Sequence, residues 1–129
     1  MGGRQERDGR MLTVRPEQME AFRRAAATRF AARMVAHLGA TLPDEVRGLR
    51  EQTVESLVSL GIEAAQGYGI RTADGVKRFL EATVRLGSGF DTDPARPELG
   101  AALRDPEIDG NAKLDRLEKL AGLDGSHRA

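Results

Sequence analysis

The strongest hydrophobic pattern in the chain lies between residues 53 and 86, where apolar positions recur every three or four residues in two successive segments. This spacing places the apolar side chains on one face of a helix. The first segment carries Val54, Leu57, Val58, Gly61, Ile62 and Ala65, and the second carries Val76, Phe79, Leu80, Thr83 and Val84. A glycine hinge, residues 67–72, joins the segments, and an acidic turn, residues 87–94, follows them. We therefore predict a helix-hinge-helix pair at the centre of the fold.

Local signals indicate where these two helices begin and end. The first is expected from about Glu51, and Gly67 stands where a left-handed C-cap would follow its last turn. Thr72 is a suitable N-cap for the second helix, which should run to about Leu86. The hinge therefore occupies only the few residues between the two caps.

A longer helix is predicted before this pair. It should begin at Pro16, because proline suits the first helical position, and end near Leu38, before Gly39. Apolar residues recur along it at Met19, Phe22, Ala26, Phe30, Met34 and Leu38. A short turn or helix from Pro43 connects it to the central pair.

Two short helical segments follow the acidic turn. Pro97 starts the first and Asp105-Pro106 breaks it, and Asn111 is the expected cap of a last helix that ends near Gly122. No alternating run typical of a β-strand occurs. We predict an all-α protein: a single small bundle of about five to six helices in residues 11–122, with a disordered leader, residues 1–10, and a frayed tail, residues 123–129.

Composition narrows the class of protein. The chain has 129 residues, a formal net charge of +0 and no cysteine, which excludes disulfides and thiolate chemistry. The neutral charge gives no general attraction to nucleic acid or anionic membranes. No segment approaches the roughly 18 apolar residues of a membrane span, and the N-terminus lacks the apolar run of a signal peptide. We expect a cytoplasmic protein that binds no membrane, and the neutral charge disfavours nucleic acid as its partner.

Candidate metal and catalytic motifs fail on spacing. A calcium loop counted from Asp91 lacks the required glycine and final acid, and one counted from Asp105 ends at Arg116. His37 and His127 are the two histidines, and neither has a neighbouring partner suited to zinc binding or nucleophilic catalysis. We therefore expect no metal, no cofactor and no catalytic residue.

The hinge also partly matches a helix-turn-helix motif. Ala65, Gly69 and Ile70 match its small, glycine and apolar positions, but the apolar residues of the second helix fall one place out of step. The charges of that helix are mixed, because Lys77 and Arg78 are offset by acidic residues. DNA binding therefore stays an alternative and not the main interpretation.

Two surfaces are candidates for binding a protein partner. The long first helix carries an arginine stripe that is either a solvated face or a dock for an acidic partner, formed by Arg23, Arg24, Arg29 and Arg33. The hinge and turn are expected to leave four side chains exposed: Tyr68, Phe90, Asp91 and Asp93.

Three stretches together resemble a family of small bacterial proteins of poorly defined role, typically encoded beside type VI secretion spike and effector genes. The stretches are residues 11–19 (MLTVRPEQM), the hinge at residues 67–70 (GYGI) with its capping threonine, and residues 86–94 (LGSGFDTDP). The chain departs from the family pattern by carrying Gly67 before Tyr68 and by lacking a tryptophan soon after Pro94. The resemblance implies no catalytic residues.

From the residues and the resemblance we expect a non-catalytic adaptor or accessory protein of a type VI secretion system, which binds a spike component or effector. One alternative is a helix-turn-helix DNA-binding regulator. Another is an immunity protein that blocks a secreted toxin with the acidic turn, through Asp91 and Asp93 beside Phe90.

Overall fold

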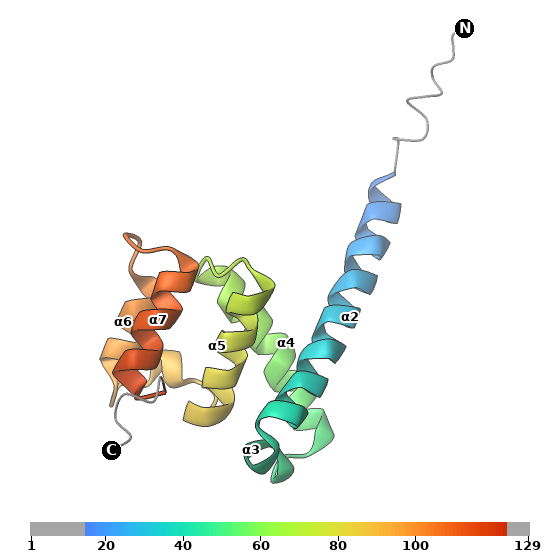
Figure 1. Cartoon of the computed structure of the whole chain (residues 1–129). Helices are drawn as coiled ribbons and strands as arrows, with labels where there is room; N and C mark the ends of the chain where they lie inside the picture. The colour runs from blue at the N-terminus through green and yellow to red at the C-terminus, as the bar shows by residue number, and fades with distance from the viewer. Residues whose placement is uncertain (1–14, 124–129) are drawn as a thin grey trace, which may run out of the picture. The chain divides into compact units, whose positions relative to one another are not determined.

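The computed structural model describes residues 15–123, which form six α-helices and one short 3-10 helix. The elements are α2 (Pro16–Thr41), α3 (Pro43–Arg47), α4 (Glu51–Gly67), α5 (Ala73–Leu86), η1 (Phe90–Thr92), α6 (Pro97–Arg104) and α7 (Gly110–Ala121) (Figure 1). No strand occurs in this described range, so the all-α prediction is confirmed. The predicted leader, residues 1–10, and all but the first residue of the predicted tail lie outside it.

The chain divides into two compact units, one ending at Phe30 and the other beginning at Ala31. The described part of the first unit, residues 15–30, consists almost entirely of the first part of α2. The second unit contains the rest of α2 and all later helices.

The second unit is built around α5, which packs against α3, α4 and α7, while α6 packs against α7 and η1 (Figure 1). The inward face of α5 buries Val76, Phe79 and Leu80, as its helical spacing predicts. The fully buried large side chains of the unit are Leu38, Val58, Ile70, Leu80, Leu99, Leu103, Leu114 and Leu117. α5 is therefore the central helix of the second unit, and α4, its partner across the hinge, packs on it.

The predicted helix ends agree with the structure to within a few residues, but three residues predicted to mark them, Gly39, Gly67 and Asn111, do not do so. α2 continues through Gly39 to Thr41, so Gly39 does not end it. The first turn of α7 is capped by Asp109, whose carboxylate accepts a hydrogen bond from the Ala112 amide at 2.9 Å, and not by Asn111. Asn111 is instead one residue inside the helix.

The hinge after α4 is a Schellman motif centred on Gly69. The Gly69 amide donates to the Gln66 carbonyl at 3.0 Å, and the Ile70 amide donates to the Ala65 carbonyl at 2.9 Å. Gly69 has φ +80°, whereas Gly67 is the last helical residue, so the prediction that Gly67 is the left-handed cap is wrong. The motif turns Ile70 into the core, where it is 1% exposed.

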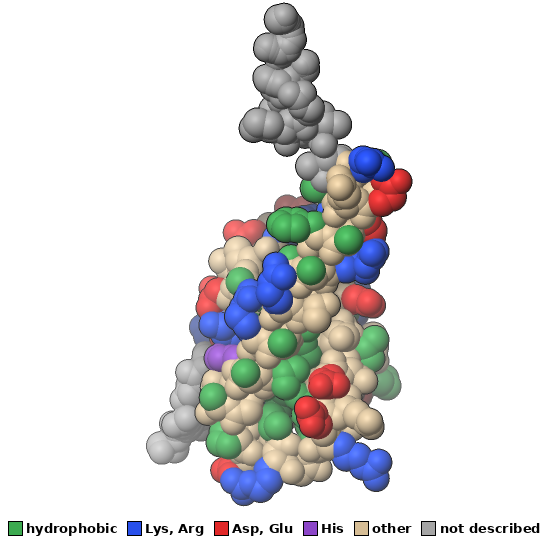
Figure 2. Space-filling view, turned by 90° about the vertical axis from the view of Figure 1, so that its right-hand side faces the viewer, with side chains coloured by type: hydrophobic (Ala, Val, Ile, Leu, Met, Phe, Trp, Pro, Cys, Tyr) green, Lys and Arg blue, Asp and Glu red, His purple; other side chains and the backbone are tan. Residues whose placement is uncertain are grey.

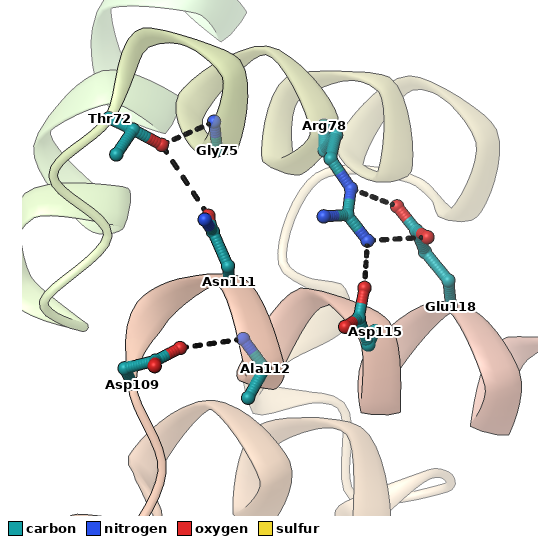
Figure 3. A network of polar contacts seen from close by, with 8 residues as sticks. All are labelled: Thr72, Gly75, Arg78, Asp109, Asn111, Ala112, Asp115 and Glu118. Atoms are coloured by element: carbon teal, nitrogen blue, oxygen red, sulfur yellow. Dashed lines mark hydrogen bonds and ion pairs between the residues drawn. The ribbon is translucent and has the colours of Figure 1, made fainter.

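Thr72 caps α5 as predicted, because its hydroxyl accepts a hydrogen bond from the Gly75 amide at 2.9 Å. The same hydroxyl lies 3.4 Å from the side-chain oxygen of Asn111 in α7 (Figure 3). The beginnings of α5 and α7 are therefore neighbours.

Candidate protein-binding surfaces

The first part of α2 carries an uncovered apolar row. Every residue from 15 to 29 is exposed, and Phe22 keeps 67% and Met19 36% of its surface accessible. Met19, Phe22 and Ala26 share one face of the helix by their spacing of three and four. Farther along α2, Met34 and Leu38 are buried in the second unit. The apolar character of α2 therefore has a packing role only in its later part.

Two arginines border this apolar row. At about 100° per residue, Arg23 and Arg29 project on either side of it, and Glu17 and Glu20 project farther round the helix. In the space-filling view that faces α2, hydrophobic and basic side chains lie close together along the helix (Figure 2). The row and its two arginines form the surface that we call the α2 face: Met19, Phe22, Arg23, Ala26 and Arg29.

The predicted arginine stripe is therefore not one uniform surface. Arg24 projects away from the apolar row, and its guanidinium lies 3.8 Å from the Glu20 carboxylate. The two residues form an exposed ion pair one helical turn apart. Arg23 lies 3.9 Å from the same carboxylate. Arg33 is exposed but belongs to the second unit. Arg23 and Arg29 are the two members of the stripe that flank the row in the first unit.

The hinge and the acidic turn are joined by a hydrogen bond. The Tyr68 hydroxyl donates to the Asp91 carboxylate at 2.5 Å, across 23 residues of sequence. Burial, together with the hydrogen bond to Asp91, raises the pKa of Tyr68 to about 12. Arg104 donates to the Asp91 backbone carbonyl at 3.4 Å. The two predicted site residues Tyr68 and Asp91 are thus brought together, but they bind each other.

Two other predicted residues of the turn also have internal roles. Phe90 is only 5% exposed, because it packs on Phe79 with ring centroids 5.6 Å apart, so the expectation that it is a surface residue was wrong. The Asp93 carboxylate accepts a hydrogen bond from the Ala95 amide at 2.9 Å, which closes the turn. The turn therefore uses its conspicuous side chains mainly to hold its own shape.

A groove of about 180 Å³ lies between α4 and the turn. Its lining is mainly apolar, with Leu57, Leu60 and Ala64 on one side and Gly89 and Phe90 on the other. Leu60 is 65% exposed. We call this feature the α4 groove. Sequence periodicity indicates the helix, but it does not indicate the groove, because the turn that forms the second wall is placed by tertiary packing.

Polar contacts that the sequence does not predict hold α5 against α7. Nε and Nη2 of Arg78 donate to the two carboxylate oxygens of Glu118 at 2.9 and 2.8 Å, and Nη2 also donates to Asp115 at 2.7 Å (Figure 3). These carboxylates raise the pKa of Arg78, with Glu118 the largest cause. Asp115 and Glu118 of α7 thus both bind a residue of another helix.

Two further polar contacts link distant segments. The ammonium group of Lys113, a largely buried residue of α7, donates to the Tyr68 carbonyl at the end of α4 at 2.7 Å. Nε2 of His37 lies 2.6 Å from a carboxylate oxygen of Glu81 in α5. Sequence reasoning missed both partners, since they are 45 and 44 residues away.

No group of three or more His, Cys, Asp or Glu residues in the described range could hold a metal ion. No helix there combines the length and the apolar character that a membrane span requires. No family model matches the chain, and neither the curated proteins nor the solved structures give a match.

Proposed function

We propose that this protein is a non-catalytic adaptor that binds another protein through the α2 face. The observation that carries the proposal is the exposure of Phe22, at 67%, on a helical row whose later members Met34 and Leu38 are buried. A large aromatic side chain costs free energy when it stays in water, and interface centres are enriched in such residues. A partner that covers Phe22 would recover that free energy.

The charge around the row indicates the chemistry of the partner. Arg23 and Arg29 border the apolar side chains, and arginine forms forked hydrogen bonds with carboxylates. The proposed partner surface is therefore apolar at its centre and carries Asp or Glu at its edges. Such an arrangement matches the apolar core and polar rim of ordinary protein interfaces.

The partner that we propose is a spike component or effector of a type VI secretion system, bound in the cytoplasm. The support is the resemblance of residues 11–19, 67–70 and 86–94 to small proteins encoded beside such genes. A cargo or spike protein must be recognised without being chemically altered, which is consistent with a role that needs binding surfaces and no catalytic group.

The helix-turn-helix alternative has less support from the geometry. α5 would have to be the recognition helix, whose side chains reach into the major groove. Val76 and Phe79 of α5 are buried in the core, and Arg78 is held by Glu118 and Asp115. One of the three basic side chains of α5, Arg78, is thus already bound by two carboxylates.

The toxin-immunity alternative depends on the acidic turn. Asp91 and Asp93 each accept an internal hydrogen bond, and Phe90 is buried, so the three residues that this alternative depends on already have structural roles. An Asp91→Ala, Asp93→Ala variant that loses protection of a toxin-expressing host, with its fold intact, would favour this alternative over the adaptor.

The adaptor proposal is tested by titrating the full chain against purified spike and effector proteins encoded beside its gene, with calorimetry as the readout. Phe22→Ser and Arg29→Glu should each weaken binding about tenfold or more, the usual effect of removing an interface anchor. Leu49→Ser is the matched control, because Leu49 is also exposed but lies after α3. Absence of binding, or binding that Phe22→Ser leaves unchanged, would contradict the proposal.

A further inference from the structure

The α4 groove has the dimensions and the lining of a site for one aromatic or branched side chain. Its volume is about 180 Å³. An apolar cavity of about 150 Å³ in another protein binds benzene, so a phenyl ring is of the right order for this space. Leu57, Leu60 and Phe90 would contact the ring, and Leu60 is presently 65% exposed at the rim.

Two carboxylates, those of Glu63 and Asp91, lie at the groove. α4 contains no lysine or arginine, and its other two glutamates, Glu51 and Glu55, project from the opposite side of the helix. Glu63 is exposed and follows Leu60 by three residues, so both lie on neighbouring positions of the helix surface. Asp91 lines the groove on the opposite wall. The side chain that enters should therefore be flanked by basic residues.

The chain itself contains a segment that meets both requirements. Residues 15–30 carry four arginines and two glutamates, so this segment is basic where α4 is acidic. Its most exposed large apolar side chain is Phe22, and Arg23 and Arg29 project on either side of the row that contains it.

We propose that the α4 groove binds the α2 face of a second copy of the protein, so that the protein self-associates. The Phe22 ring of one copy enters the groove of the other and covers Leu60. An arginine beside that ring meets the carboxylate of Glu63. The contact is between two different surfaces, so each copy offers both a donor helix and an acceptor groove.

Self-association goes beyond the proposed function and does not depend on it. Where both hold, the two contacts compete, because they use the same α2 face. A protein partner then binds at the expense of the self-contact, and the apparent affinity for that partner falls as the adaptor concentration rises.

Sedimentation velocity of the full chain over a wide concentration range tests the self-contact. The wild type should show a concentration-dependent shift toward a larger species. Phe22→Ser and Leu60→Ser should each weaken the association about tenfold or more. Leu120→Ser should leave it unchanged, because Leu120 is an exposed leucine on α7 that does not line the groove.

Mixing the two variants gives the decisive result. Phe22→Ser chains keep an intact groove and Leu60→Ser chains keep an intact α2 face, so an equimolar mixture should recover association that neither variant shows alone. Circular dichroism confirms that both variants are folded. A wild type that is monomeric at every concentration would overturn the proposal. The proposal would also be overturned if Leu60→Ser left the association unchanged, because α2 would then pair with α2. A mixture that recovers no association would overturn it as well.

Discussion

The hydroxyl of Tyr68 donates a hydrogen bond to the carboxylate of Asp91, and this bond ties the end of α4 to η1. It joins the hinge and the acidic turn, the two stretches that looked most like binding loops in the sequence. Both instead support the wall of the α4 groove. The conspicuous residues of the turn therefore serve mainly to hold the groove wall in place, and less to contact a partner themselves.

Tyr68 should ionise at a higher pH than an ordinary tyrosine. It is the single tyrosine of a chain without tryptophan, so the absorbance of tyrosinate reports on it alone. Burial and Asp91 raise its pKa to about 12, above the ordinary value of about 10 in an unfolded chain. Between about pH 10 and about pH 12, the folded state thus keeps the Tyr68 proton that the unfolded state has lost. The resulting contribution to the free energy of unfolding is complete below about pH 10 and is lost as pH rises through about 12.

The measurement is a spectrophotometric titration of the native protein and of Asp91→Asn. The substitution removes the negative charge but leaves the burial, so the pKa of Tyr68 should fall part of the way toward its ordinary value. A native protein that titrates like free tyrosine, or an unchanged midpoint in Asp91→Asn, would show that the bond is not formed in solution.

Arg78→Ala should lower the free energy of unfolding by about 2–4 kcal/mol, because it leaves the Glu118 carboxylate, 23% exposed, without its forked partner. Arg47→Ala removes an exposed pair with Asp44 at 2.9 Å and should change the value by less than about 0.5 kcal/mol. Urea denaturation of both variants gives the comparison. Equal effects would mean that the α5–α7 contact contributes no more than a surface ion pair.

Two helical glycines should respond to alanine in opposite directions. A Cβ at Gly100 in α6 would collide with the Asp91 backbone carbonyl, which cannot move without displacing η1, so Gly100→Ala should destabilise by about 1–3 kcal/mol. A Cβ at Gly39 in α2 would meet nothing within 4 Å, so Gly39→Ala should stabilise by about 0.5–1 kcal/mol. Thermal unfolding tests the pair, and a stabilising Gly100→Ala would contradict the packing of α6 on η1.

Features that depend on neighbouring residues could be predicted from the sequence. The spacing of Val76, Phe79 and Leu80 predicts the buried face of α5, and Thr72 predicts its start, because both signals act within one or two turns. The predicted left-handed cap, Gly67, lies two residues before the observed one, Gly69, because any glycine can adopt positive φ. Sequence alone does not tell which of them occupies that position.

Features that depend on distant residues could not be predicted. Arg78 finds Glu118 across 40 residues, and no local pattern marks that pair. The burial of Phe90 follows from its contact with Phe79, which requires the turn to fold back on α5. The sequence predicts the arginines of the α2 face, but it does not predict that Phe22 is uncovered. Periodicity marks Phe22 and Met34 alike, and only the structure separates the exposed row from the buried one.

Hydrogen exchange of the backbone amides shows which residues of the chain a protein partner covers. The full chain is compared alone and with a purified spike or effector protein, at a chain concentration below that of self-association. We expect slower exchange in residues 16–30 of the wild-type protein when the partner is added, and no such change in Phe22→Ser. Slower exchange confined to the turn at residues 88–93, with residues 16–30 unchanged, would contradict it.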